Sequence, residues 1–106
     1  MGTKLIEATP GNFSLLYTDF EHSDLFDEIG FEGGGYDWQS VMVYILETEL
    51  PDLEDEIDFD SEAGMFCAYG QNKEALAKLG EKMEELIANK AKLKEAISNV
   101  PKDYWD

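Results

Sequence analysis

Arginine is absent from this sequence, and its eight basic residues are all lysines. They are outnumbered by 24 aspartates and glutamates, which gives a net charge of −16 at pH 7. Nucleic acids and anionic membranes are bound through Lys and Arg that displace counterions, so this charge argues against both as partners. It favours encounter with a basic partner, although acidity alone is also typical of proteins that are merely well dissolved.

Cysteine and long apolar runs are equally scarce. Cys67 is the only cysteine, so the chain has no internal disulfide, and no segment approaches the ~18 apolar residues of a membrane span. The first twenty residues have no apolar run of the kind that a signal peptide needs. We therefore expect a cytoplasmic protein. With 43% apolar residues, the chain can form one domain with its own core over residues 1–106.

The acidic residues are concentrated in the N-terminal two-thirds of the chain. Residues 1–72 hold one lysine and 17 acids, a balance of 1 − 17 = −16, whereas residues 73–106 hold seven of each and sum to zero. Nine acids and no base lie in residues 47–62, and seven acids lie in residues 19–37. Such density costs stability by self-repulsion, and it exceeds what solubility requires.

Apolar periodicity and turn residues predict an α+β fold in the order β-β-(α)-α-β-β-α-α. We expect a mainly antiparallel sheet of about four strands, packed by a central helix and by C-terminal helices. The predicted elements are strands at Lys4–Thr9 and Phe13–Thr18, a helical turn capped by Ser23, a central helix from the N-cap Asp37 to near Glu49, a short turn at 51–57, strands at Ile57–Asp60 and Met65–Tyr69, and helices near 73–88 and 91–99.

The core is expected to form around the central helix. The spacing i, i+3, i+4, i+7, i+8 places one apolar stripe on that helix, at Trp38, Val41, Met42, Ile45 and Leu46. The almost wholly apolar run from Met65 to Tyr69 is typical of a central strand covered on both faces, which would place Cys67 in the core. Tyr104 and Trp105 are expected to fold back on the body.

The stretch FEGGGYDWQS, residues 31–40, invites comparison with a phosphate-binding loop. Such loops need glycines followed by Lys and Ser/Thr, or a spaced GxGxxG. Here Glu32 and Asp37 flank the glycines, and no lysine lies between Lys4 and Lys73. A carboxylate N-cap would also occupy the amides that an anion needs. The glycines are therefore expected to form a flexible, positive-φ loop that leads into the central helix.

The sequence offers one candidate cation site and one candidate catalytic pair. Asp58, Asp60 and Glu62 alternate as in a calcium loop, but Ala63 stands where the sixth-position glycine is needed. On a strand they would simply share one solvent-facing side, which is the favoured interpretation. Cys67 and His22 are too few for a transition-metal site, and a lone cysteine in an apolar strand usually serves packing. We expect no metal, no cofactor and no enzymatic activity.

What remains is a binding surface for a basic protein. Tyr36 is the best candidate for an exposed aromatic anchor, since Trp38 begins the apolar stripe. The expected partner-binding residues are Glu28, Glu32, Tyr36, Asp37, Glu47, Asp52, Glu54, Asp55 and Glu56.

Two quoted stretches, GFEGGGYDWQSV and LPDLEDEIDFDSEAGMFCAYGQNKEALAKL, are similar to a known family. They resemble the bacterial polymorphic-toxin immunity proteins numbered fifty-one in the immunity-protein series, over roughly residues 26–100. The positions most specific to the resemblance are Gly33, Gly35, Tyr36, Trp38, Asp60, Glu62, Gly64, Met65, Phe66 and Ala68. Of these, Gly33, Gly35, Trp38, Asp60, Glu62, Gly64 and Phe66 are expected to be structural.

The resemblance implies a small protein without catalytic activity or cofactor that binds a toxin and blocks it before it harms the producing cell. The charge suggests a basic toxin, with a nuclease as one class, bound by a monomer or weak dimer. Two alternatives stay open at this point. One is a general acidic adaptor or DNA mimic, and the other is a divalent-cation binder that uses Asp58, Asp60 and Glu62.

Overall fold

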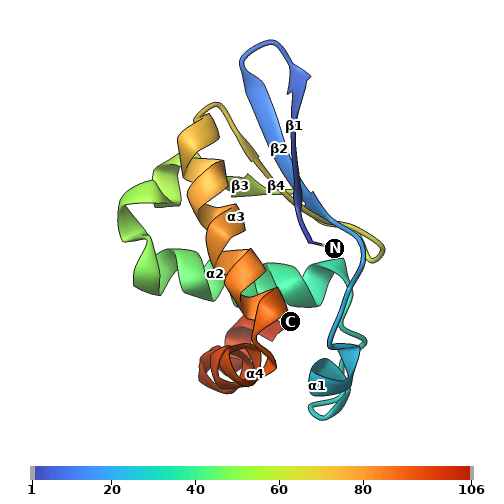
Figure 1. Ribbon diagram of the computed structural model, residues 1–106. Helices are drawn as coiled ribbons and strands as arrows, with labels where there is room; N and C mark the ends of the chain where they lie inside the picture. The colour runs from blue at the N-terminus through green and yellow to red at the C-terminus, as the bar shows by residue number, and fades with distance from the viewer. Residues whose placement is uncertain (1, 106) are drawn as a thin grey trace.

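The computed structural model describes residues 2–105, and its strands form one antiparallel sheet in the order β1-β2-β4-β3. The predicted α+β fold is confirmed (Figure 1). The elements are β1 (Lys4–Thr9), β2 (Asn12–Tyr17), α1 (Ser23–Asp27), α2 (Gly35–Glu49), the 3-10 helix η1 (Pro51–Glu56), β3 (Asp58–Phe59), β4 (Phe66–Gly70), α3 (Lys73–Ala88), α4 (Lys90–Asn99) and the 3-10 helix η2 (Lys102–Trp105).

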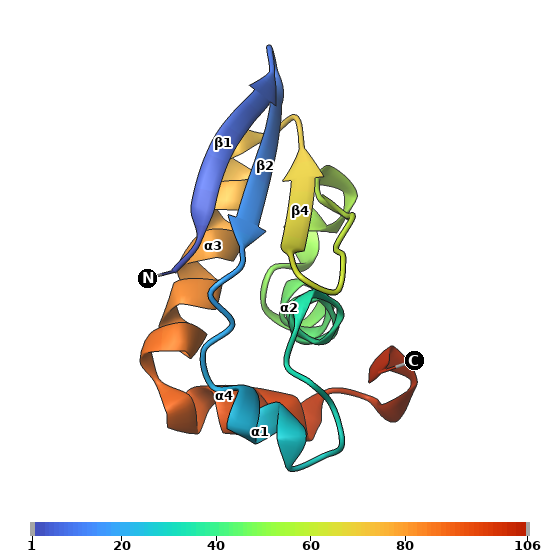
Figure 2. The ribbon, with the colours of Figure 1, turned by 90° about the vertical axis from the view of Figure 1, so that its right-hand side faces the viewer.

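The sheet is covered by helices on one face only. In Figure 2, β1, β2 and β4 lie in front of α3, with no helix over their near side. Pairing of Leu15 with Ala68 and of Leu16 with Cys67 puts these two pairs on opposite faces. The expectation that both faces of β4 are covered is therefore wrong, because alternation turns Tyr69 outward, where it is 42% exposed. Cys67 also points to the open face, although it is buried.

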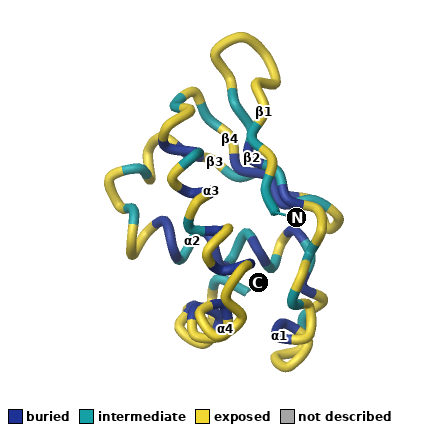
Figure 3. Tube along the Cα trace, viewed as in Figure 1, coloured by how far each residue is buried: buried dark blue, intermediate teal, exposed yellow. Residues whose placement is uncertain are grey.

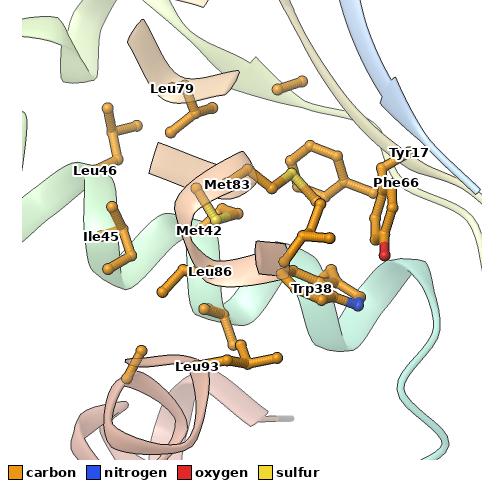
Figure 4. Packing of buried hydrophobic residues seen from close by; sticks show 14 of the residues in the cluster. Tyr17, Trp38, Met42, Ile45, Leu46, Phe66, Leu79, Met83, Leu86 and Leu93 are labelled. Carbon is orange, nitrogen blue, oxygen red and sulfur yellow. The ribbon is translucent and has the colours of Figure 1, made fainter. Parts of the chain in front are cut away.

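The apolar stripe on α2 is confirmed as the centre of the core. All five of its residues are buried, and Trp38 is fully enclosed. The Trp38 ring packs edge-on against Tyr17, with 5.2 Å between ring centroids (Figure 4). The centroid of the Phe26 ring lies 5.6 Å from that of Trp38. Trp38 thereby joins the sheet, α1 and α2. Met83 and Leu93 bring α3 and α4 to the same cluster.

Two predicted helix caps are wrong. α1 begins at Ser23 and its N-cap is His22, which has a left-handed φ of 65°. α2 begins at Gly35 with Gly34 as N-cap, so Asp37 lies inside the first turn. A carboxylate in the first turn is still favourable, because it faces the positive end of the helix dipole. The Asp37 carboxylate accepts a hydrogen bond of 2.7 Å from the backbone N–H of Gly33 and closes the loop on itself.

The glycines serve close packing more than flexibility. A positive φ is confirmed for Gly33 (80°), but Gly34 has extended backbone angles and Gly35 is helical. The Gly35 N–H donates to the carbonyl of Ala63 at 3.1 Å. A Cβ on Gly35 would overlap the carbonyl oxygens of Glu62 and Met65. This glycine therefore allows the start of α2 to rest on the turn between β3 and β4.

The C-terminal part follows the predicted pattern closely. Asn89 ends α3, and its side chain accepts a hydrogen bond from the backbone N–H of Lys92 at 3.1 Å, which caps α4. The expected break between the two helices is confirmed. The tail also folds back, since Trp105 stacks on Phe31 with 5.1 Å between centroids. The hydroxyl of Tyr104 donates to the carboxylate of Glu47.

α1 is held to the C-terminal helices by two polar contacts. His22 Nε2 lies 2.7 Å from the carbonyl oxygen of Ile87 at the end of α3. Lys90 Nζ lies 2.6 Å from a carboxylate oxygen of Asp24. Figure 3 shows that the outer side of α1 is exposed, as is the tip of the β1-β2 hairpin. No helix within residues 2–105 is long and apolar enough to cross a membrane.

Gly35→Ala should destabilise the protein by about 3 kcal/mol, the upper end for an overpacked site, because its Cβ meets backbone that cannot move aside. Gly64→Ala is the matched control, since a Cβ there has nothing within 4 Å. It should change the free energy of unfolding by less than about 0.5 kcal/mol. Urea unfolding followed by tryptophan fluorescence measures both, and equal losses would contradict the packing argument.

The Asp24 carboxyl should titrate below its ordinary pKa of 3.8, because the Lys90 ammonium donates a hydrogen bond to it. A carboxyl whose pKa is lower in the folded state than in the unfolded state stabilises the fold at pH values above its unfolded-state pKa. This stabilisation is lost as the pH falls through the folded-state pKa. Lys90→Gln should return this pKa toward 3.8 in an NMR titration of the carboxyl carbons. Lys92→Gln should leave it unchanged, because Lys92 pairs with Glu85.

Candidate functional site

The one cysteine and the one histidine do not form a catalytic pair. His22 contacts the end of α3, whereas Cys67 lies on the open face of the sheet, which α3 does not cover. The backbone N–H of Cys67 donates to Ser61 Oγ at 3.0 Å. Burial raises the pKa of the Cys67 thiol above its ordinary 9.0, with a further contribution from the nearby carboxylate of Asp60. The thiol therefore stays protonated and is a poor nucleophile.

The carboxylates of Asp58, Asp60 and Glu62 do not converge. All three are exposed, and Asp58 pairs across the sheet with Tyr69 while Glu62 pairs with Met65. Within residues 2–105, no three His, Cys, Asp or Glu side chains lie together in an arrangement that would hold a metal ion. The alternation of acids is that of an edge strand whose side chains face solvent.

Exposed carboxylates follow the chain from the end of α2 to the β3-β4 turn. From η1 the chain turns back through β3 to the β3-β4 turn, where Ala63 contacts Gly35 at the start of α2. We name the exposed acids along this path the acidic band: Asp52, Glu54, Asp55, Glu56, Asp58, Asp60 and Glu62.

The lysines do not neutralise this band. The ion pairs among residues 2–105 join Lys82 to Glu49, Lys90 to Asp24 and Lys92 to Glu85, and all lie outside it. Within the band, Glu56 accepts a hydrogen bond from the side chain of Asn72 at 3.1 Å. The band is therefore a solvated surface of one sign, available to an outside cation.

The predicted partner-binding residues fall into two groups. Figure 1 places η1 beyond one end of α2 and α1 below the other end. The first group lies at η1 and the end of α2, and comprises Glu47, Asp52, Glu54, Asp55 and Glu56. The second group comprises Glu28 at the end of α1, Glu32 in the loop of residues 29–34, which we name the glycine loop, and Tyr36 and Asp37 in the first turn of α2. The acidic band follows the chain from the first group to the β3-β4 turn, where Ala63 contacts Gly35 next to the second group.

Three of these residues have structural partners inside the chain. Asp37 holds Gly33, Glu47 accepts from Tyr104, and Glu56 accepts from Asn72. The others are exposed, and Tyr36 is the most exposed of the large hydrophobic residues, at 59%. Its ring stands at the rim of a hollow of about 310 Å³ beside the glycines. Whether these side chains contact a partner stays a prediction.

The motif residues separate into buried and exposed positions. Gly33, Gly35, Trp38 and Phe66 are buried, whereas Asp60, Glu62 and Gly64 are exposed in and before the β3-β4 turn. Glu62 and Met65 exchange two backbone hydrogen bonds of 2.8 and 3.1 Å, which close that turn. The two quoted motifs thus meet in space, because the turn supports the glycine loop.

A second hollow was not predicted from the sequence. It has a volume of about 490 Å³ and lies between α1, α4 and the C-terminal tail. Its apolar walls are formed by Leu25, Ile29, Phe31, Ile97, Val100 and Trp105. We name it the Phe31 hollow. Phe31 and Trp105 lie 74 residues apart and follow no helical or strand period, so only the tertiary fold brings them together.

Comparison with known proteins identifies one family. The model of the family described as Immunity protein 51 matches residues 3–102, which is nearly the whole chain. No curated protein and no solved structure matches this chain. The match includes both quoted motifs and the N-terminal hairpin. This chain belongs to the Immunity protein 51 family.

Proposed function

We propose that this chain neutralises a basic toxin domain by binding it through the acidic face formed by the band and the glycine loop. It acts stoichiometrically and without catalysis, inside the cell that makes the toxin. The observation that carries the proposal is the acidic band, because seven exposed carboxylates follow one path and no lysine in residues 2–105 forms an ion pair with them. Membership of an immunity-protein family supports the role itself.

The carboxylates of the acidic band repel one another, and this repulsion is the physical reason for expecting a basic partner. Neighbouring like charges destabilise a folded chain unless something offsets them. A basic partner removes that repulsion on binding and is drawn to the band over a distance of about 10 Å at ordinary ionic strength. A nuclease fits this description, because its cleft for nucleic acid is lined with Lys and Arg. The inhibitor would then compete directly with the phosphate backbone.

The toxin domain encoded beside the gene for this chain should form a 1:1 complex with it. Isothermal titration calorimetry and analytical size exclusion measure the complex, and co-expression measures rescue of growth. Absence of both complex and rescue would contradict the proposal. Equal binding to unrelated basic proteins, such as lysozyme and histones, would instead indicate a general acidic adaptor or DNA mimic.

The triple variant Asp52→Asn, Glu54→Gln, Asp55→Asn should slow association with that toxin domain by roughly tenfold at low salt. Loss of steering charge lowers the association rate constant and flattens its dependence on salt. The matched control is Glu74→Gln, Glu81→Gln, Glu95→Gln, which removes three exposed acids from α3 and α4. Stopped-flow fluorescence at several salt concentrations measures both. Equal slowing would mean that total charge matters and the band does not.

Tyr36→Ala should weaken binding by about 2 kcal/mol or more if this exposed ring is an anchor. Ile6→Ala is its control, because Ile6 is also exposed, at 39%, but lies on β1, at the opposite edge of the sheet from β3. Titration calorimetry compares the two variants with the unmodified chain. A larger loss for Ile6→Ala would move the contact to the β1-β2 hairpin.

A further inference from the structure

We propose that the Phe31 hollow receives a large apolar side chain from the basic face of the toxin, and that this contact determines how long the complex lasts. The inference rests on the proposed function and adds the place and chemistry of the main contact. The acidic band would bring the two proteins together, and the hollow would hold them.

The hollow has the anatomy of a binding hot spot. Hot spots form where a large side chain enters a desolvated pocket that is ringed by polar groups. Ile29 stands in the wall with 44% of its surface exposed, beside the apolar side chains of Phe31 and Trp105 in the same lining. The aromatic side chains of the hollow are held in place by packing, because Phe31 stacks on Trp105 and the Trp105 ring also contacts Phe26 edge-on. A volume of about 490 Å³ is ample for a leucine or phenylalanine side chain.

The charges around the hollow indicate what surrounds that apolar side chain. Glu28 lines the hollow, and Asp27 and Glu32 line an adjoining one that shares Phe31. These three carboxylates form no ion pair within residues 2–105. They lie on the α1 side, where Lys or Arg residues of the partner would find them. An acidic or neutral partner would gain nothing from this rim.

The opposite rim carries the other sign. Lys94 of α4 and Lys102 of η2 line the hollow across from Glu28. A basic group that flanks the apolar side chain is therefore attracted at one rim and repelled at the other. This asymmetry fixes the orientation in which the partner docks and disfavours basic proteins of different shape. It gives a general acidic surface the means to prefer one toxin.

Position along the molecule separates the two roles. η1 lies beyond the far end of α2 from α1, so the acidic residues of η1 do not border the hollow (Figure 1). Carboxylates that remain hydrated contribute to the association rate more than to the lifetime of a complex. Apolar groups that lose their water on binding contribute mainly to the dissociation rate.

The test is the dissociation rate of the toxin domain encoded by the neighbouring gene, measured by biolayer interferometry. Ile29→Glu adds an acid at the hollow, so binding by charge alone would be unchanged or tighter. Our inference instead predicts dissociation faster by at least about tenfold, since a carboxylate cannot pack against an apolar side chain. Ile6→Glu is the matched control, because Ile6 is 39% exposed and lies on the distant hairpin. It should leave the dissociation rate within about twofold.

A second pair of variants guards against a folding defect at residue 29. Ser98→Trp fills the hollow from α4 and should give the same loss, whereas Ala91→Trp on the exposed side of that helix should not. Circular dichroism melting confirms that each variant is folded. The triple variant Asp52→Asn, Glu54→Gln, Asp55→Asn described above should slow association and leave the dissociation rate unchanged.

The outcomes separate this inference from the proposed function. If the unmodified chain fails to bind the toxin domain, the proposed function is wrong and this inference falls with it. If it binds and both Ile29→Glu and Ser98→Trp dissociate at the unmodified rate, only the inference is overturned. If light scattering shows a dimer that Ile29→Glu separates, the occupant is a second copy of this chain, and the inference is again overturned.

Discussion

The rest of the structure depends on the contact between the start of α2 and the β3-β4 turn. Gly35 donates to Ala63 and lies against the carbonyls of Glu62 and Met65 with no room for a side chain. This contact sets the position of α2, and hence of Trp38, which lies one turn further along the helix and joins the sheet to α1. The same contact brings the acidic band to the glycine loop. One backbone-to-backbone approach thus links the centre of the core to the exposed acids that end at the β3-β4 turn.

Much of the fold could be predicted because it follows from local patterns. The stripe from Trp38 to Leu46 has helical spacing, the break at Asn89 interrupts an apolar series, and Pro51 ends α2. The errors arose where tertiary packing overrides local preference. Asp37 has ordinary N-cap chemistry, yet the helix begins two residues earlier because Gly35 packs on a distant turn. β4 reads as fully covered, although only one face of the sheet carries helices.

The sequence alone was enough to predict that the candidate site is acidic, but it was not enough to predict the shape of the site. A count of acids located the band, since carboxylates in an arginine-free chain have few internal partners. The division of the predicted partner-binding residues between two ends of α2 depends on the direction of that helix, which no local pattern contains. The Phe31 hollow is built from residues of α1, the glycine loop, α4 and η2. Its walls belong to segments up to 80 residues apart, from Leu25 to Trp105, so only the assembled fold could show it.

Asn89 gives the structure a means of adjustment at a distance. One asparagine ends α3 and caps α4, so it sets the angle at which α4 leaves the body. α4 forms one wall of the Phe31 hollow, while α1, tied to it by Asp24 and Lys90, forms another. The width of the hollow therefore depends on the backbone geometry at residue 89, which is not among its lining residues.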